Sequence, residues 1–381
     1  MHERHLHIGV DARVLAERHT GVAVYTRLLL RHLLLIREQA RLTLFSHRPI
    51  DSSVLASIDT SGRISVCCRW CPSPMPARPF WDHVLIPAAA ASRDLDLFFS
   101  PLSVVPRFLH VPTVVTVHDL GFLRFQAVQP LKYRWYWRAT LQRAARVADR
   151  LIAVSQSTAL DMVQLLRVDP KKIDMIYEAA DPFFLREPSP EEESRIMRSL
   201  GLERGYILTV GTLEPRKNYN TVLQVLDRLR EQRPQLRLVI VGSAGWLCED
   251  IVRAIRGDPE RIRWLDHADN GTLRVLYRGA SVFLFPSLYE GFGLPVLEAM
   301  ACGTPVVTSN ASSLPEVAGE AAICTPAQDT QALLRAVLGL LKDEPLREEY
   351  RRKGYEQVRR FSWERAAKTT WETFEKALGK G

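Results

Sequence analysis

The stretch VFLFPSLYEGFGLPVLEAMACG, residues 282–303, places a strand, a glycine-bearing turn and a helix start in immediate succession. The apolar run at its start predicts a buried strand that ends at Pro286, and Pro295 is typical of the first turn of a helix. Gly291 and Gly293 have no Cβ, so the backbone of this turn can approach a ligand closely. Backbone N–H groups at a helix N-terminus also favour an anion. The stretch therefore predicts an α/β fold with a ligand site at the end of a strand.

Short apolar and β-branched runs alternate with helical runs along the rest of the chain. They predict strands at residues 7–10, 42–45, 95–99, 113–117 and 151–154, and again at residues 206–210, 236–241, 262–265, 282–285 and 305–308. This alternation is the mark of parallel sheets with crossover helices. Two such series in succession predict two doubly wound domains.

A break separates the two series of strands. Residues 181–190 read DPFFLREPSP, and Ser189 is predicted to cap a helix that carries Pro190 and three glutamates in its first turn. We place the hinge here. The first domain is predicted over residues 1–185 and the second over residues 186–361.

The final helical run covers residues 362–378. Trp371 and Phe374 are three residues apart and share one face of the predicted helix. An apolar face of this kind is expected to dock on another part of the fold.

The composition is that of an ordinary globular protein, with 381 residues, 46% hydrophobic and 25% charged. No apolar run is long enough for a membrane-spanning helix, and the first residues contain no apolar core of a signal peptide, so we expect a cytoplasmic protein. The net charge of +8 favours an anionic partner: nucleic acid, anionic lipid or a phosphorylated substrate. No zinc-finger, RRM or KH signature is present, which argues against nucleic acid.

The chain has six cysteines, and Cys68 and Cys71 form a C-x-x-C pair that could indicate zinc or redox chemistry. No second pair lies at metal-ligand spacing, and prolines at 72, 74 and 76 indicate a loop. We expect reduced, unpaired thiols and no metal.

A second motif, VGTLEPRKN, occupies residues 210–218 and follows the first predicted strand of the second domain. Open α/β sheets bind ligands beyond the carboxyl ends of their strands. Arg216 and Lys217 would place two cations there, beside a predicted helix start at Asn218. Paired cations can stabilise a diphosphate leaving group without a metal. The alternative is a solvated charged loop.

Glu290 and Glu298 flank the glycine turn and the first turn of the helix after it. Two carboxylates at this spacing can both face the ligand site, where they could accept hydrogen bonds from sugar hydroxyls. The alternative is a tight turn followed by a helix with a solvated glutamate.

With both motifs present, the sequence resembles the retaining, GT-B-fold glycosyltransferases of family 4. Two glutamates separated by seven residues are that family's signature. The resemblance covers nearly the whole chain, and in the first half it includes the loop around Gly21, the pair His118-Asp119 and residues 153–155. It implies two Rossmann-like domains that face each other across a cleft. The first would contain the acceptor side and the second the nucleotide-sugar site, with the terminal helix, residues 362–381, crossing back to the first domain.

The resemblance also implies roles for individual residues. His118 would lie by the transferred sugar and, with Asp119, on the acceptor side. Glu290 would hold sugar hydroxyls and Glu298 the ribose. The residues implied in catalysis are His118, Arg216, Lys217 and Glu290. Those implied in donor binding are Gly21, Gly211, Arg216, Lys217, Glu290, Gly291, Phe292, Gly293, Leu294 and Glu298.

This chain departs from the family pattern at two positions. Ala23 replaces a second glycine two places after Gly21, and Thr212 stands where some members have an arginine. Arg216 would then supply that charge. Neither departure removes a residue type implied in catalysis.

The expected reaction is transfer of a hexose with retention of configuration, without a metal or other cofactor. The motifs look like those of bacterial mannosyltransferases, so GDP-mannose is the predicted donor, with UDP-glucose, UDP-N-acetylglucosamine and other GDP-sugars left open. The expected acceptor is a saccharide or lipid-linked saccharide in surface polysaccharide synthesis. Alternatives are a nucleotide-sugar epimerase or a sugar phosphorylase on the same fold, or a catalytically silent binding module.

Residues 132–150 mix cations with aromatic side chains, beginning KYRWYWR. Such a segment can lie on an anionic bilayer, here the inner face of the membrane. It can equally be an ordinary helix with inward aromatics and solvated arginines.

Overall fold

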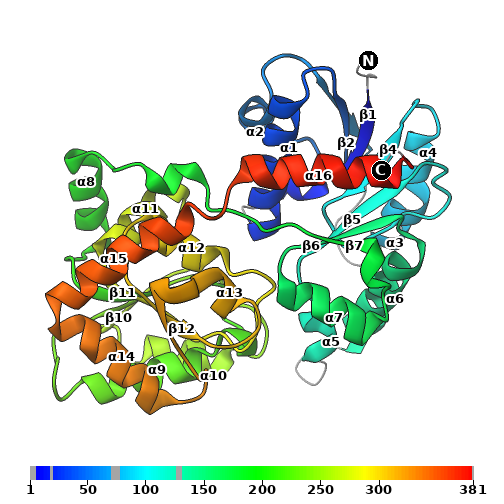
Figure 1. Ribbon diagram of the computed structural model, residues 1–381. Helices are drawn as coiled ribbons and strands as arrows, with labels where there is room; N and C mark the ends of the chain where they lie inside the picture. The colour runs from blue at the N-terminus through cyan, green and yellow to red at the C-terminus, as the bar shows by residue number, and fades with distance from the viewer. Residues whose placement is uncertain (1–5, 18–19, 70–77, 126–130, 380–381) are drawn as a thin grey trace. The chain divides into compact units, whose positions relative to one another are not determined.

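The computed structural model describes residues 6–17, 20–69, 78–125 and 131–379, without the side chains of residues 78 and 131–135. The chain divides into two compact units (Figure 1). One comprises Met1–Arg124, Pro130–Glu178 and Ser362–Gly381, and the other comprises Ala179–Phe361 together with Phe125. The chain thus leaves the first unit after Glu178, seven residues before the predicted end of the first domain, and returns at Ser362.

The first unit contains a parallel sheet of seven strands in the order β3-β2-β1-β4-β5-β6-β7. The strands are β1 (His7–Asp11), β2 (Arg41–Ser46), β3 (Ile64–Cys68), β4 (Leu97–Ser100), β5 (Thr113–Val117), β6 (Arg150–Ala153) and β7 (Ile173–Met175). The five predicted strands are present. Two further strands, β3 and β7, form the edges of this sheet. Edge strands are buried less completely than central ones, so their sequences show a weaker apolar pattern.

The helices of the first unit connect these strands. They are α1 (Gly21–Ile36), α2 (Ser52–Ile58), α3 (Arg78–Phe80), α4 (Ile86–Ala90), α5 (Gly121–Arg124), α6 (Leu131–Val147), α7 (Gln156–Leu166) and α16 (Trp363–Ala377), with the shorter turns η1 (Arg13–Ala16), η3 (Trp81–Leu85) and η5 (Pro170–Lys172). The predicted loop at Gly21 is wrong, because Gly21 is the first residue of α1. The Thr20 hydroxyl oxygen accepts a hydrogen bond from the Ala23 N–H at 3.2 Å and caps the helix, which therefore begins at Gly21.

The second unit contains a parallel sheet of six strands in the order β10-β9-β8-β11-β12-β13. The strands are β8 (Tyr206–Val210), β9 (Leu238–Val241), β10 (Ile262–Leu265), β11 (Ala280–Phe285), β12 (Val306–Ser309) and β13 (Ala322–Thr325). The helices and turns around them are η6 (Pro182–Leu185), α8 (Pro190–Leu200), η7 (Pro215–Lys217), α9 (Tyr219–Leu229), α10 (Glu249–Arg256), α11 (Asn270–Gly279), α12 (Leu294–Ala301), α13 (Leu314–Ala318), η8 (Gly319–Ala321), α14 (Thr330–Lys342) and α15 (Glu344–Val358). Only β13, at the sheet edge, was not predicted.

Serine side chains cap helices in both units, and the predicted cap at Ser189 is confirmed. The Ser189 hydroxyl accepts a hydrogen bond from the Glu192 N–H at 3.1 Å, and α8 begins at Pro190 with three glutamates in its first turn. The Ser155 hydroxyl accepts one from the Thr158 N–H at 2.9 Å and begins α7. Local capping chemistry therefore sets where these helices start.

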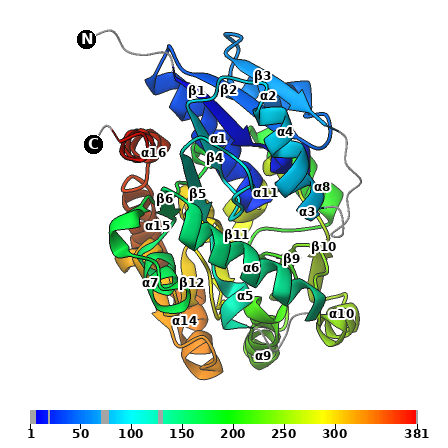
Figure 2. The ribbon, with the colours of Figure 1, turned by 90° about the vertical axis from the view of Figure 1, so that its right-hand side faces the viewer.

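The terminal helix α16 returns to the first unit, as expected from the resemblance. It packs on α1 and on β5 and β6 (Figures 1 and 2). The Trp371 indole donates a hydrogen bond to the Leu33 carbonyl oxygen at 3.1 Å, and the Phe374 ring lies 5.4 Å from that of Phe99 between centroids. The shared face of Trp371 and Phe374 is thus the docking face.

Two aromatic side chains of the segment 132–150 point into the first unit. The Tyr136 hydroxyl donates to the buried Asp82 carboxylate at 2.5 Å, and Trp137 stacks on Phe122 at 5.1 Å. These contacts agree with an ordinary helix for this part, whereas the side chains of residues 132–135 lie outside the described set. Among the described helices, none combines the length and apolar character needed to cross a membrane.

We expect Phe374→Ala to destabilise the first unit by about 3 to 5 kcal/mol, the usual cost of emptying a buried phenylalanine site. Phe374 is 1% exposed and belongs to the core under α16. Urea unfolding measures the loss, and Glu372→Ala, at an exposed position of the same helix, is the matched control. Equal stability of the two variants would show that α16 does not contribute to the fold of this unit.

Candidate active site

The two sequence motifs of the second unit lie side by side. The Leu288 N–H donates to the Arg216 carbonyl oxygen at 2.8 Å, and the Asn218 amide donates to the Pro286 carbonyl oxygen at 3.0 Å. Asn218 has φ of 60°, a left-handed conformation that asparagine tolerates better than most residues. This turn ends η7 and starts α9, so the loop after β8 is held against the loop after β11.

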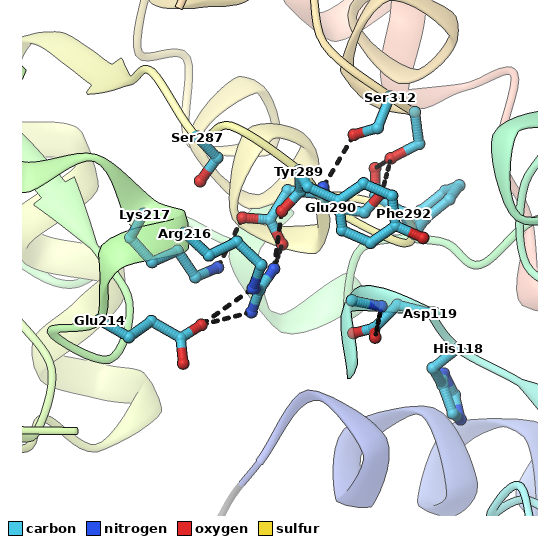
Figure 3. Close-up of polar contacts among 12 residues, drawn as sticks. His118, Asp119, Glu214, Arg216, Lys217, Ser287, Tyr289, Glu290, Phe292 and Ser312 are labelled. Carbon is cyan, nitrogen blue, oxygen red and sulfur yellow. Dashed lines mark hydrogen bonds and ion pairs between the residues drawn. The ribbon is translucent and has the colours of Figure 1, made fainter. Parts of the chain in front are cut away.

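Arg216 and Lys217 bind the two oxygens of one carboxylate (Figure 3). The Lys217 Nζ lies 2.7 Å from Glu290 Oε1, and the Arg216 Nη1 lies 2.8 Å from Glu290 Oε2. The Arg216 guanidinium also donates to the Tyr289 carbonyl oxygen at 2.8 Å and to the Glu214 carboxylate, with Nη2 and Oε1 2.6 Å apart. The structure therefore brings together three of the residues implied in catalysis and adds Glu214, which sequence reasoning missed.

The ion-pair network of Glu214, Arg216, Lys217 and Glu290 has little exposure to solvent. The side chains of Glu214, Glu290 and Lys217 are 3%, 9% and 11% exposed, while that of Arg216 is 20% exposed. Two cations face two carboxylates, so the formal charges balance. Burial of this kind is tolerated because every charge has a partner of opposite sign.

Burial and pairing act against each other on the protonation of these groups. Burial raises the pKa of Glu290, but the charges of Arg216 and Lys217 outweigh it and lower that pKa to about 2. Burial also lowers the pKa of Lys217, against the opposing effect of Glu290. The pKa of Glu214 is raised by burial, despite the two cations. Glu290 is therefore ionised at neutral pH. Each of its carboxylate oxygens has a further lone pair that can accept a hydrogen bond from a hydroxyl group.

Gly211 leaves space for the Lys217 side chain to reach Glu290. Its φ is +146°, and a Cβ at this position would lie 3.2 Å from Lys217 Cε. The Gly211 carbonyl oxygen also accepts a hydrogen bond from the Tyr219 hydroxyl at 2.5 Å. The absence of a side chain at Gly211 therefore leaves space for the lysine side chain.

Two serines that sequence reasoning missed support the glycine turn. The Ser312 hydroxyl accepts a hydrogen bond from the Glu290 N–H at 2.8 Å, and the Ser313 hydroxyl contacts the carbonyl oxygens of Glu290 and Phe292 at 3.0 and 2.7 Å. Ser312 has φ of 50°, a rare conformation for a serine. The only signal in the sequence was a serine-rich loop, which has no periodic pattern.

The turn then leads into α12. Gly293 has φ of +112° and precedes Leu294, the first residue of the helix. A Cβ on Gly293 would lie 2.9 Å from the Leu314 side chain. The first N–H groups of a helix have no partner within the helix, which keeps this end suited to an anion. Gly291 and Phe292 belong to the same turn, immediately after Glu290.

Glu298 lies on α12, one turn beyond the glycine turn. Its Oε2 accepts a hydrogen bond from the Tyr277 hydroxyl at 3.0 Å. Tyr277 is fully buried, and both its burial and the negative charge of Glu298 raise its pKa well above the ordinary value. Tyr277 thus remains a neutral donor that orients the carboxylate, and sequence reasoning missed it as well.

The first unit positions His118 and Asp119 directly after β5. The His118 Nδ1 lies 3.0 Å from Glu178 Oε1, and the Nε2 lies 2.9 Å from the Pro101 carbonyl oxygen. The Asp119 carboxylate accepts a hydrogen bond at 2.8 Å from the N–H of Gly121, the first residue of α5. Both residues therefore lie at the carboxyl edge of the first sheet, where ligands of open sheets bind.

In the part of the chain that the structure describes, no group of three or more histidine, cysteine, aspartate or glutamate side chains could hold a metal ion. Cys68 is the last residue of β3 and has a free thiol. Its C-x-x-C partner, Cys71, lies outside the described residues.

Two family models match the two halves of the chain. Residues 19–182 match Glycosyltransferase Family 4, and residues 191–357 match Glycosyl transferases group 1. The predicted resemblance to the glycosyltransferases of family 4 is thereby confirmed.

Two curated relatives are mannosyltransferases. The chain is 33% identical over 250 residues to O-antigen chain mannosyltransferase B of Escherichia coli, an alignment that covers 65% of each chain. It is 34% identical over 259 residues to MMP alpha-(1->4)-mannosyltransferase of Mycolicibacterium hassiacum, covering 64% of this chain and 59% of that one. Both alignments thus span less than two thirds of the relative's length.

A solved structure supports the fold. Sucrose-phosphate synthase from Thermosynechococcus elongatus matches with a TM-score of 0.78 at 21% identity, covering 99% of this chain and 100% of that one. Together with the two parallel-sheet units, this match confirms the predicted GT-B class.

The low pKa of Glu290 predicts an acid-dependent contribution to stability. Its folded pKa of about 2 lies below the ordinary 4.5, so the contribution is fully present above pH 4.5 and declines as the pH falls toward 2. The stability difference between the wild type and Glu290→Gln should therefore shrink by about 1 to 2 kcal/mol between pH 7 and pH 3.5. Urea unfolding at both pH values measures it. A difference that stays constant with pH would contradict the ion-paired state of Glu290.

Proposed function

We propose that this chain, which belongs to the glycosyltransferases described by the family 4 and group 1 models, transfers a hexose from a nucleotide diphosphate sugar with retention of configuration. In this reaction the bond between the anomeric carbon and the diphosphate oxygen breaks. A new bond forms between that carbon and an acceptor hydroxyl oxygen, and the hydroxyl proton leaves with the diphosphate or to solvent. Negative charge develops on the diphosphate as the sugar departs.

The main support for the proposal is that Arg216 and Lys217 both form ion pairs with Glu290 at the carboxyl edge of the second sheet. Both cations are fixed before any ligand arrives, and they lie in a site with little water. Preorganised charges of this kind stabilise a developing anion without reorganisation during the reaction. Arg216 is the more exposed of the two, so it would meet the diphosphate first, and no metal ion would be needed.

Glu290 would accept hydrogen bonds from the hydroxyls of the transferred sugar. Each of its oxygens already has one cation, and the remaining lone pairs can still accept. Glu298, oriented by Tyr277, would bind the ribose, and the turn from Gly291 to Leu294 would add backbone N–H groups. His118 and Asp119 would act from the first unit, on the acceptor side, and Gly21 near the diphosphate.

GDP-mannose is the proposed donor, supported by the two relatives that are named mannosyltransferases. One of them is named for O-antigen chains, which supports a saccharide or lipid-linked saccharide of a surface polysaccharide as the acceptor. The proposed location is the cytoplasm, at the inner face of the membrane when the acceptor is lipid-linked.

A thermal-shift panel of GDP, UDP, ADP and their sugars tests the donor, because a bound ligand raises stability by mass action. Product analysis with and without a saccharide acceptor then separates a transferase from an epimerase or a phosphorylase. We expect stabilisation by GDP and GDP-mannose, and a new glycoside only when the acceptor is present. Stabilisation by no nucleotide in the panel would overturn the proposal.

We expect Lys217→Met to lower turnover about a hundredfold or more, the scale of losing one preorganised electrostatic contact. Methionine keeps the buried stem of the side chain and removes only the charge. Lys353→Met is the matched control, because Lys353 pairs with Glu349 on α15, away from the network. Transfer should also survive EDTA. Near-normal turnover of Lys217→Met, or loss of transfer in EDTA, would rule out this leaving-group mechanism.

We expect Glu290→Gln and Glu298→Gln to separate sugar binding from nucleotide binding. Glu290→Gln should weaken the binding of GDP-mannose more than that of GDP, because the partners of Glu290 would be sugar hydroxyls. Glu298→Gln should weaken the binding of both ligands alike, because the partner of Glu298 would be the ribose. Calorimetric titration of GDP and GDP-mannose into each variant measures the two effects, and the same pattern in both variants would contradict this assignment.

A further inference from the structure

We propose that Glu178 and Tyr25 are positioning residues that hold the His118 ring in one orientation. The proposal rests on the proposed function, because it takes His118 to lie beside the transferred sugar. It adds two residues to the site that neither sequence motif contains. Both belong to the first unit and contact His118 from different elements.

The contact with Pro101 determines one ring proton. The His118 Nε2 lies 2.9 Å from the Pro101 carbonyl oxygen, which can only accept a hydrogen bond. Nε2 therefore carries a proton. The backbone of His118 is held as well, since its carbonyl oxygen accepts a hydrogen bond from the Thr158 hydroxyl at 3.4 Å.

The contact with Glu178 determines the other nitrogen. Nδ1 lies 3.0 Å from Glu178 Oε1, and Glu178 is 4% exposed, so water does not compete. A carboxyl group at one ring nitrogen and a carbonyl oxygen at the other engage both sides of the imidazole. The ring therefore has one fixed orientation, in which the N–H shared with Pro101 can also donate to an oxygen of the substrate.

Tyr25 fixes the plane of the ring. Its own ring meets that of His118 edge to face, with centroids 4.7 Å apart and an angle of 89°. The Tyr25 hydroxyl forms a hydrogen bond with the Thr116 hydroxyl at 2.9 Å, and Tyr25 is fully buried. The Trp363 ring also contacts the Tyr25 ring, with centroids 5.9 Å apart. A buried aromatic ring with these contacts cannot move away from the histidine without opening the core.

The positions of these supports along the chain are informative. Glu178 is the last residue of the first unit before the chain passes into the second, and Trp363 is the second residue after its return. His118 is thus held, directly through Glu178 and indirectly through Tyr25, by residues beside two of the points where the chain passes between the units.

A double-mutant cycle tests the proposal. We expect Glu178→Ala to lower kcat about 10- to 100-fold with little change in KM for GDP-mannose, because a small misplacement of a site group has this scale of effect. Glu178→Gln should recover most of the loss, since its amide can still hydrogen-bond to Nδ1. In a His118→Ala background, Glu178→Ala should cause no further loss, because the residue would act only through His118. An equal loss in both backgrounds would overturn the proposal.

Tyr25 has its own pair of variants. Tyr25→Phe keeps the ring and should retain most of the activity, whereas Tyr25→Leu should behave as Glu178→Ala does and show the same dependence on His118. Should Tyr25→Leu or Glu178→Ala fail to fold, the Gln and Phe variants still test the ring contacts. A large loss in Tyr25→Phe that persists without His118 would contradict a positioning role.

An NMR measurement separates this proposal from the proposed function. The ¹⁵N signals of the His118 ring, assigned by comparison with His118→Ala, should show that both nitrogens are hydrogen-bonded in the wild type. In Glu178→Ala, the Nδ1 signal should move to the position of an unbonded nitrogen. This result is independent of any donor sugar. A free Nδ1 in the wild type would overturn the proposal even if transfer is observed, whereas absence of transfer with a bonded Nδ1 would count against the proposed function alone.

Discussion

The ion pairs of Glu290 with Arg216 and Lys217 are the constraint on which the second unit's site depends. A carboxylate this deeply buried is tolerated only because each oxygen has a cation, and the cations are tolerated only because of the carboxylate. The same pairs join the loop after β8 to the loop after β11, so the charge that would act on a substrate also holds the two loops together. Structure and chemistry cannot be separated at this point, and a substitution in the network changes both.

Much of the fold could be predicted because central parallel strands are apolar along their whole length. The runs that became β5 and β8 are buried throughout or nearly so, and their patterns were clear. The strands that were missed lie at sheet edges, and β7 has only three residues. Helix starts at Ser155 and Ser189 followed from local capping. The start at Gly21 did not, because a glycine at that point favoured a loop and the hydroxyl of Thr20 reversed it.

The site was predictable only where residues close in sequence act together. Arg216 and Lys217 are neighbours, and Glu290 follows a recognisable strand and turn. Their partners are separated in sequence from the groups that they orient: Glu178 lies 60 positions from His118, and Tyr277 lies 21 positions from Glu298. Only the three-dimensional packing identifies such residues. Glu214 was within the predicted loop, yet a buried glutamate there has the same local sequence as a solvated one.

The order of the elements along the chain has a consequence for biosynthesis. All of the second unit's residues from Ala179 to Phe361 are translated before α16, which completes the first unit. Until α16 emerges from the ribosome, the surface of α1 that receives Trp371 stays uncovered, together with the face of the sheet beneath Phe374. All six strands of the second unit, from β8 to β13, are therefore synthesised before the last helix of the first unit. Exposed apolar surface on an unfinished domain is where nascent chains aggregate or recruit chaperones.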